Sequence, residues 1–286
     1  MYNDPDGALP QSNSMWQSGK VQPKHLRAVV KARLGLTCNK KLAKRQRRPY
    51  WFRHSTRPTT DSKCPLCGGE DSVSHMTGGC THPTIRGIIL DRHNSTVARI
   101  CKALQSRRAG GCFTVRDAGK AEDVAKAGAA CKRLHGLGWL LPTAPFCPNV
   151  LRVHNLLPHP TLAECHRAAA QKQVHPSDVI EVGYCADTRW KDTYDERKRN
   201  QHNGLICALE AAGWPVRRYT IMLGSLGAIY KSLLRHLQEL GLHPKDALAP
   251  IADLSIAAVT DAWKLRAMRR RLEHTRRVRG TPHNPG

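Results

Sequence analysis

Hydrophobic positions recur at two different spacings along this chain, and each spacing predicts one kind of secondary structure. Apolar residues lie three and four positions apart over residues 26–34 and again over 85–104, which is the spacing of one face of a helix. The run VIEVGY, residues 179–184, is instead rich in β-branched residues and alternates, and residues 216–223 have a similar composition. These two runs are predicted strands.

Two further helices are predicted to follow the two strands. One covers residues 192–212 and ends before Gly213-Trp214-Pro215, and the other covers residues 228–240 and is terminated by Gly241. A strand–helix–strand–helix order with a long crossover implies parallel strands in a right-handed unit. The chain is therefore predicted to be an α/β protein.

Composition divides the chain into five parts. Residues 1–20 are polar and turn-forming and are predicted to be disordered, and residues 21–104 are predicted to be basic and helical. Residues 105–150 are rich in Gly, Ala and Pro, which predicts a linker. The α/β domain is expected at 151–245, and a basic helix and tail at 246–286.

Three cysteines and a histidine lie close together in the run CPLCGGEDSVSHMTGGC. Their spacing is Cys64-x2-Cys67-x7-His75-x4-Cys80. Thiolate and imidazole are the ligands of structural zinc, and four of them close a tetrahedral site that leaves no open position for catalysis. His82 is an alternative fourth ligand, and unrelated reduced cysteines near a histidine are the alternative to a metal site. The spacing predicts a structural zinc knuckle over residues 64–82.

The charge of the chain is strongly positive and unevenly distributed. There are 46 Lys and Arg against 22 Asp and Glu, which gives a net charge of +24. Residues 1–63 contain 14 basic residues against 3 acids, and residues 262–286 contain 8 against one. A solvated basic face would explain either run alone, but two such runs beside a zinc knuckle favour binding to the phosphates of DNA or RNA. The residues predicted to contact nucleic acid are Lys40, Lys41, Lys44, Arg45, Arg47, Arg48, Arg53, Arg269, Arg270 and Arg271.

The cysteines are predicted to be reduced. The sequence has 11 of them, it does not open with an apolar secretory segment, and no apolar run is long enough to span a membrane. Reduced cysteines are typical of intracellular proteins. We therefore expect a chain that is not secreted and not membrane-bound, and that is nuclear, or cytoplasmic before import.

A second candidate site involves the first predicted strand and the helix after it. Glu181 lies inside the otherwise apolar strand, where a carboxylate needs a cation or another partner. On the next helix, Lys198, Gln201 and His202 share one face and are predicted to project towards that strand. A carboxylate that holds Mg²⁺ and a lysine that stabilises developing charge are the minimal requirement for metal-assisted phosphodiester cleavage. A structural Glu–Lys ion pair is the alternative.

Two blocks of the chain resemble the C-terminal part of non-LTR retrotransposon polyproteins. CPLCGGEDSVSHMTGGCTHP followed by DRHNSTVARI is similar to the zinc knuckle and the next helix of these proteins. The second block, VIEVGYCADTRWKDTYDERKRNQHNGLICALEAAGWPVRRYTIMLGSLGAIYKS, resembles the core of their restriction-like endonuclease. The resemblance covers about 64–101 and 178–241, in the order of the family. It implies a zinc knuckle among helices, followed by a restriction-endonuclease-like βαβα core with flanking basic helices. The reverse transcriptase is missing, so the chain resembles a C-terminal remnant of such a polyprotein, from a decayed copy.

The resemblance also implies roles for individual residues. It assigns the second catalytic carboxylate to Glu181 and the helix lysine to Lys198, with the adjoining motif at residues 201 and 202. In the family an earlier Pro-Asp pair supplies the first metal-binding acid. The nearest candidate, His159-Pro160-Thr161-Leu162, has threonine in place of aspartate, and Glu164 is the candidate substitute.

Two functions are therefore predicted for the chain. The first is a nucleic-acid-binding endonuclease module that nicks target DNA for target-primed reverse transcription, with structural zinc and with Mg²⁺ in the nuclease site. Loss of the first acid would leave that site decayed, because the hard Mg²⁺ ion needs oxygen ligands. The alternative is a non-enzymatic zinc-knuckle protein that binds DNA or RNA and has a structural α/β domain. The position of Glu164 relative to Glu181 distinguishes the two.

Overall fold

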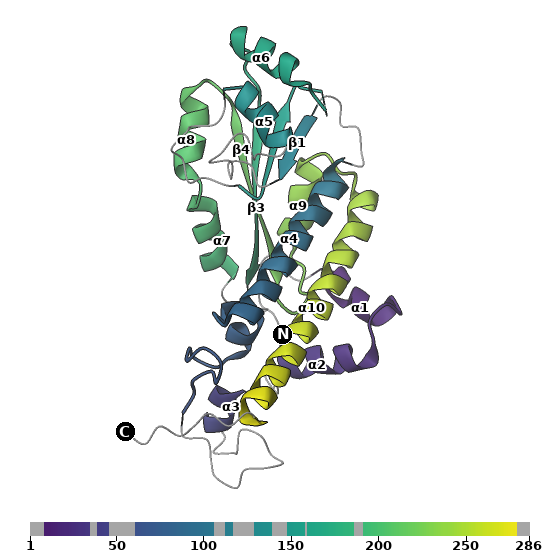
Figure 1. The fold of residues 1–286 in the computed structure, drawn as a ribbon. Helices are drawn as coiled ribbons and strands as arrows, with labels where there is room; N and C mark the ends of the chain where they lie inside the picture. The colour runs from purple at the N-terminus through teal and green to yellow at the C-terminus, as the bar shows by residue number, and fades with distance from the viewer. Residues whose placement is uncertain are drawn as a thin grey trace, which may run out of the picture.

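A mixed four-stranded sheet forms the centre of the structure, with helices on both of its faces (Figure 1). The computed structural model describes residues 9–34, 39–45, 61–105, 112–116, 129–138, 148–157, 159–185 and 191–278. The strands, in their order across the sheet, are β1 (Cys112–Arg116), β2 (Val150–His154), β3 (Ser177–Cys185) and β4 (Val216–Gly224). The first three pair antiparallel, while β3 and β4 pair in parallel along their whole length. The predicted α/β class and the parallel pairing of the two predicted strands are confirmed.

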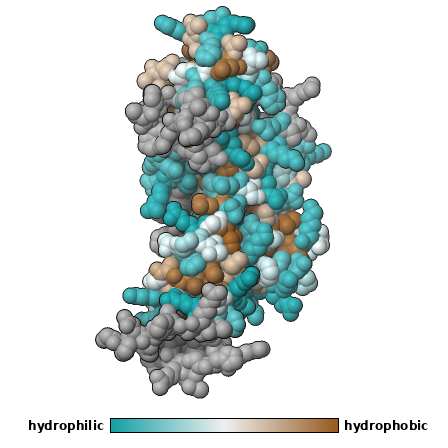
Figure 2. Space-filling model, in the orientation of Figure 1, coloured by the Kyte–Doolittle hydropathy of each residue, from teal (hydrophilic) through white to brown (hydrophobic). Residues whose placement is uncertain are grey.

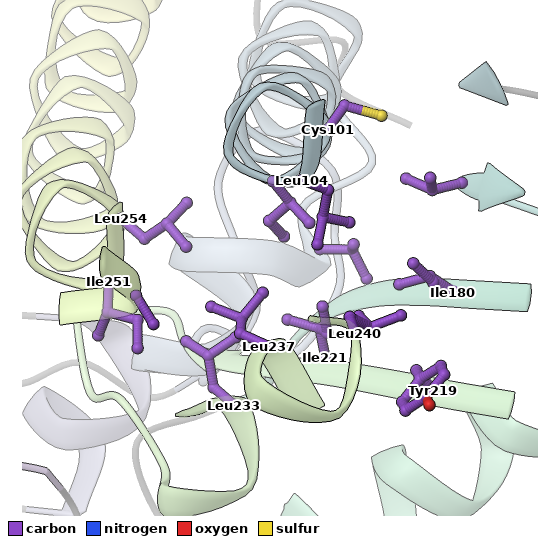
Figure 3. Close-up of a cluster of buried hydrophobic side chains, with 14 of the residues drawn as sticks. Cys101, Leu104, Ile180, Tyr219, Ile221, Leu233, Leu237, Leu240, Ile251 and Leu254 are labelled. Carbon is purple, nitrogen blue, oxygen red and sulfur yellow. The ribbon is translucent and has the colours of Figure 1, made fainter. Parts of the chain in front are cut away.

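One face of the sheet packs against three helices. These are α4 (Pro83–Gln105), α9 (Lys231–Glu239) and α10 (Pro244–Val278). Ile180 of β3 and Ile221 of β4 point to this face, where they meet Leu104, Leu237 and Leu254 from the three helices in one buried cluster (Figure 3). The helix predicted over 85–104 is thus α4, and its apolar stripe is the surface that it buries.

The opposite face carries the helices that connect the strands. They are α5 (Ala129–Gly136), α6 (Leu162–Ala170), α7 (Lys191–Asn200) and α8 (Asn203–Ala211). Leu134, Cys165 and Leu205 from α5, α6 and α8 bury against Val179 of β3. Because neighbouring residues of a strand point to opposite faces, Glu181 lies on the same face as Val179.

The crossover between β3 and β4 consists of two helices instead of the single helix predicted over 192–212. α7 ends at Asn200 and α8 begins at Asn203, and His202 between them has φ −120° and ψ 25°. The sequence of α7, KDTYDERKRN, contains no aliphatic residue, so this helix has no stripe to pack on the core. The three- and four-residue spacing continues through the break, and this is why the sequence does not reveal it.

The N-terminal segment has defined structure from residue 9 onward, which corrects the disorder predicted for 1–20; residues 1–8 lie outside the described residues. It forms η1 (Pro10–Asn13), α1 (Ser14–Gln17) and α2 (Pro23–Arg33), the last being the helix predicted over 26–34. Met15 and Val29 are buried against Val259 of α10. The Ser12 hydroxyl accepts a hydrogen bond at 2.8 Å from the backbone N–H of Ile229, 217 residues away. Composition cannot show such distant partners.

The segment predicted as a linker, residues 105–150, supplies part of the sheet. Its described portions contain β1, α5 and the first residue of β2. Phe113 and Val115 of β1 are buried and pair with β2 at Val153 and Leu151. A five-residue strand surrounded by Gly and Ala gives too short an alternation to stand out in the sequence.

Helix α10 is 35 residues long and changes character along its length. Its first part buries Ile251, Leu254 and Ala258 in the core, and the basic residues follow from Lys264 onward. The predicted basic C-terminal helix is therefore a core element over its first part. Its tail beyond Val278 lies outside the described residues.

The surface agrees with the polar composition. On the face shown in Figure 2, hydrophobic side chains form separate patches within a mainly hydrophilic surface. Within the described ranges, no helix combines the length and the apolar character that a bilayer crossing requires.

We expect Gly227→Ala to destabilise the fold by about 2–4 kcal/mol, because left-handed strain and overpacking act together. Gly227 has φ +90°, and a Cβ there would lie 2.7 Å from Val259 Cγ2. Gly213 has φ +82° with no atom within 4 Å of the same point, so Gly213→Ala should cost about 1 kcal/mol, the strain alone. Urea unfolding of both variants measures the difference, and equal losses would contradict the packing argument.

Candidate functional site

The four predicted metal ligands, Cys64, Cys67, His75 and Cys80, meet in one cluster. Their ligand atoms all lie within 4.8 Å of one another. Cys67 Sγ is 3.2 Å from His75 Nε2 and 3.7 Å from Cys80 Sγ. Two thiolates at about 2.3 Å from a tetrahedral zinc would be about 3.8 Å apart, so the spacing fits. The cluster could hold a metal ion such as zinc, and His82, the alternative ligand, is not a member of it.

Glycines shape the backbone around this cluster. Gly68 has φ +77°, and its N–H donates to the carbonyl of Cys64 at 2.9 Å. The N–H of Cys64 in turn donates to the carbonyl of Gly69 at 2.6 Å. A Cβ on Gly69 would lie 2.9 Å from His75 Cε1, so a larger residue would displace the ligand ring. The turn therefore positions the thiols and the imidazole together.

The thiols of the cluster do not ionise equally easily. Burial opposes the ionisation of Cys67, but the N–H groups of Gly69 and Thr81 outweigh burial, and the pKa of Cys67 is lowered. Burial, together with the neighbouring Cys64, raises the pKa of Cys80 to about 12. Three thiolates at this spacing need a cation between them, so metal binding must release protons.

Arg269 fastens the knuckle to α10. Its Nη1 donates to Asp71 Oδ1 at 2.6 Å and its Nε donates to Glu273 Oε1 at 2.7 Å, and all three side chains are at most 5% exposed. A guanidinium buried between two carboxylates is not presented to a phosphate. The prediction that Arg269 contacts nucleic acid is corrected accordingly, because tertiary contact has turned this arginine inward.

The other predicted nucleic-acid contacts lie on both sides of the knuckle. Lys41, Lys44 and Arg45 are exposed on α3 (Lys40–Arg45), and Arg270 and Arg271 are exposed on α10. Both helices contact Asp71 of the knuckle, α3 through a backbone N–H at 3.2 Å and α10 through the ion pair just described, and they lie at the same end of the molecule (Figure 1). The side chain of Lys40, and Arg47, Arg48 and Arg53, lie outside the described residues.

Glu181 is the centre of a second polar cluster. It is 3% exposed, and its Oε2 accepts from Lys198 Nζ at 3.2 Å while His202 Nε2 lies 2.8 Å from Oε1. Burial opposes its ionisation, but His202 and Lys198 outweigh burial, so the pKa of Glu181 is lowered and the carboxylate is charged at neutral pH. The structure brings together the strand acid, the lysine and the histidine, as the sequence predicts. Gln201, the fourth predicted member, is exposed.

Gly183, which has no side chain, leaves room on β3 for Lys198. Gly183 follows Glu181 by two residues on the same face, and a Cβ there would lie 2.8 Å from Met222 Sδ and 3.6 Å from Lys198 Cε. The stem of Lys198 thus passes over the bare backbone of β3. Its side chain is 27% exposed, so the ammonium group stays accessible from solvent.

Asn149 is a member of the same cluster that the sequence did not predict. It directly precedes β2, its backbone N–H donates to Glu181 Oε1 at 3.0 Å, and its Oδ1 accepts from the N–H of Val182 at 2.7 Å. A search for acidic residues passes over an asparagine. The available signal was the pair Pro148-Asn149 at the start of the apolar run VLRV.

Glu164, the candidate substitute for the first acid, and Asp178, the other acid of β3, have other roles. Thr161 is the N-cap of α6, and Glu164 completes the capping box: its Oε2 accepts from the backbone N–H of Thr161 at 2.6 Å. Asp178 lies on the opposite face of β3 from Glu181 and is fully buried, 2.7 Å from His154 Nε2 and 2.8 Å from Arg217 Nε. None of the contacts of Glu181 described above involves either acid.

No protein-family model matches the chain, and no curated protein matches its sequence. The geometry of the two clusters is therefore the basis for a functional proposal.

We expect the cluster at 64–80 to bind one zinc ion with an affinity that falls as the pH falls from about 8 to 6, because protons compete for the thiolates and the imidazole. Cys80→Ser should weaken zinc binding by at least about 100-fold. Loss of a residue that only orients a ligand already costs about 10- to 100-fold, and Cys80 is itself a ligand. His82→Ala is the matched control and should leave the affinity unchanged. Competition with a chromophoric chelator measures all three, and equal losses at 80 and 82 would overturn the ligand set.

We expect Arg269→Ala to destabilise the chain by about 3–5 kcal/mol, because it leaves two buried carboxylates without their cation. Arg271→Ala, two residues away and exposed, should change stability by no more than about 0.5 kcal/mol. Chemical denaturation of the zinc-loaded chain measures both. A small loss in Arg269→Ala would show that Asp71 and Glu273 do not depend on it.

Proposed function

We propose that the chain is a nucleic-acid-binding module derived from the C-terminal region of a non-LTR retrotransposon polyprotein, with a restriction-endonuclease-like site that has lost one metal-binding acid. The observation that carries the proposal is Pro148-Asn149 next to Glu181. In nucleases of this kind an upstream Pro-Asp pair supplies the first acid, and here a Pro-Asn pair hydrogen-bonds to the strand that bears the second.

The loss of one carboxylate decides between cleavage and binding. Mg²⁺ prefers charged oxygen ligands, and Asn149 offers a neutral amide whose oxygen already accepts from Val182. Glu181 is itself engaged by Lys198 and His202 and by the backbone of Asn149. Among the described residues, a metal ion beside Asn149 would therefore meet one carboxylate, that of Glu181, whose charge is already balanced by Lys198. This favours the binding function over an active nuclease.

The binding surface is proposed to lie around the knuckle. A resident structural zinc would hold the four ligands and, through Asp71 and Arg269, the end of α10. The exposed lysines and arginines of α3 and α10 would then contact the phosphates of DNA or RNA without reading sequence. A nuclear chain, or one that is cytoplasmic before import, would meet such a partner.

We expect the purified chain to shift supercoiled plasmid in a salt-sensitive manner but not to nick it in Mg²⁺ or Mn²⁺. Asn149→Asp should gain metal-dependent nicking, at least about tenfold above background, since it adds a second carboxylate while one oxygen still accepts from Val182. The double variant Asn149→Asp, Glu181→Ala controls for contaminating nuclease and should not nick. Conversion of supercoiled to open-circular plasmid is the measurement.

Two results would contradict this proposal. Nicking by the native chain that Glu181→Ala abolishes would mean an active endonuclease that finds its first acid elsewhere. Absence of any plasmid shift by the zinc-loaded chain would remove the nucleic-acid-binding function altogether.

A further inference from the structure

A polar pocket of about 260 Å³ lies where the knuckle meets the sheet. The knuckle contributes Ser72, Ser74 and Gly78, α4 contributes Arg92, and the ends of β3 and β4 contribute Tyr184 and Ser225. The described residues that line it include no Asp or Glu. The pocket does not include the Glu181 cluster, and on the knuckle side it borders the metal ligand His75.

Arg92 is the cationic group of this pocket. It is 3% exposed, and its guanidinium carbon lies 4.1 Å from the centre of the Tyr184 ring. The Tyr184 hydroxyl is itself fixed, 2.6 Å from Thr96 Oγ1. A Cβ built on Gly78 would lie 3.9 Å from Arg92 Nη2, so this edge of the guanidinium faces the knuckle wall. Arg92 also lines the groove between α4 and α10, and its five N–H donors are enough to serve both sides.

Hydroxyl groups line the knuckle side of the same pocket. Ser72 Oγ accepts from the backbone N–H of His75 at 3.1 Å and lies 2.9 Å from Ser74 Oγ. One hydrogen of that pair is shared between the two oxygens, and the other is left to donate. Across the pocket, Thr77 Oγ1 and Ser225 Oγ lie 3.1 Å apart and join the knuckle to the turn after β4.

We propose that this pocket binds a phosphate group, and that the group is a backbone phosphate of the nucleic acid. A buried guanidinium and hydroxyl groups in one pocket match the charge and the acceptor oxygens of a phosphate. Gly78 leaves the wall opposite Arg92 without a side chain, which keeps the space for the ligand. Identification of the phosphate as part of a nucleic acid rests on the proposed function.

The pocket lies at the knuckle end of β3. Tyr184 and Cys185 are three and four residues beyond Glu181, so the pocket starts about 10 Å further along the strand. Tyr184 packs on the face of the sheet that α4 covers, so this anion site is distinct from the Glu181 cluster on the other face.

Gly78→Asp tests the proposal, because its carboxylate would occupy the pocket next to Arg92. The backbone at residue 78 accepts a Cβ without a contact closer than 3.9 Å. We expect Gly78→Asp to weaken duplex DNA binding about tenfold and to lower the slope of log affinity against log salt by about one, as loss of one phosphate contact does. Fluorescence anisotropy at several salt concentrations measures both. In parallel, inorganic phosphate should raise the melting temperature of the native chain above that in chloride of equal ionic strength, and Gly78→Asp should lose this rise.

Matched variants separate the pocket from other effects of the substitution. Gly78→Asn fills the same space without the charge, so it measures the steric loss alone and should weaken DNA binding and the phosphate response less than Gly78→Asp. Gln171→Glu places the same charge on the exposed end of α6 and should behave as the native chain. The pair Ser74→Asp and Ser74→Asn loses the same hydroxyl in both members and differs only in charge, so the further loss in Ser74→Asp repeats the charge test from another wall. Zinc content is measured in every variant. A folding defect at residue 78 therefore cannot decide the result.

The outcomes distinguish this proposal from the proposed function. Equal DNA affinity and slope in Gly78→Asp and Gly78→Asn, with no phosphate response in the native chain, overturn the pocket. A phosphate response that Gly78→Asp loses while DNA binding is unchanged assigns the pocket to free phosphate and overturns the backbone as its ligand. If the native chain binds no DNA, the proposed function fails. The phosphate response then decides alone: its loss in Gly78→Asp keeps the anion site, and its absence overturns it.

Discussion

The parallel pairing of β3 with β4 is the constraint on which the rest of the molecule depends. Parallel neighbours cannot be joined by a tight turn, so the chain must leave the sheet after Cys185 and return at Val216 across one face. That face carries Glu181, and the crossover helices bring Lys198 and His202 to it. The polar cluster is therefore a product of topology as much as of local sequence. The other face is left for the apolar side chains of α4, α9 and α10.

The parts of the fold with long, regular patterns could be predicted from the sequence. β3 and β4 are runs rich in β-branched and apolar residues, and α4 buries one apolar stripe. The shared helix face of Lys198 and His202 was enough to predict their approach to Glu181. The parts that depend on one tertiary contact could not be predicted. Arg269 is followed directly by two further arginines, so the local sequence does not set it apart. Its buried ion pair with the distant Asp71 does. Asn149 belongs to the cluster because of its hydrogen bonds to Glu181 and Val182. An asparagine in the sequence does not indicate such bonds.

The polar contacts between the knuckle and the rest of the chain fix an orientation more than they add stability. A buried ion pair gains little over well-packed apolar groups, since both charges lose their hydration. It does, however, tolerate few alternative arrangements, and Arg269 with its two carboxylates permits one position of the knuckle on α10. The 3.1 Å contact between Thr77 and Ser225 adds a second point of attachment at the sheet. A loosely tethered metal module would lack both.

The place of α10 in the sequence has a consequence for how the chain folds. This helix comes after the four strands that the structure describes, yet the N-terminal helices, α4 and the knuckle all pack on it, through partners such as Asp71 and Arg269 that are 198 residues apart. Contacts between residues so distant in sequence form late, because long loops must close first. During synthesis, the N-terminal helices and the knuckle must therefore wait for α10 to emerge from the ribosome. Until then their apolar faces stay exposed and open to aggregation or to chaperone binding.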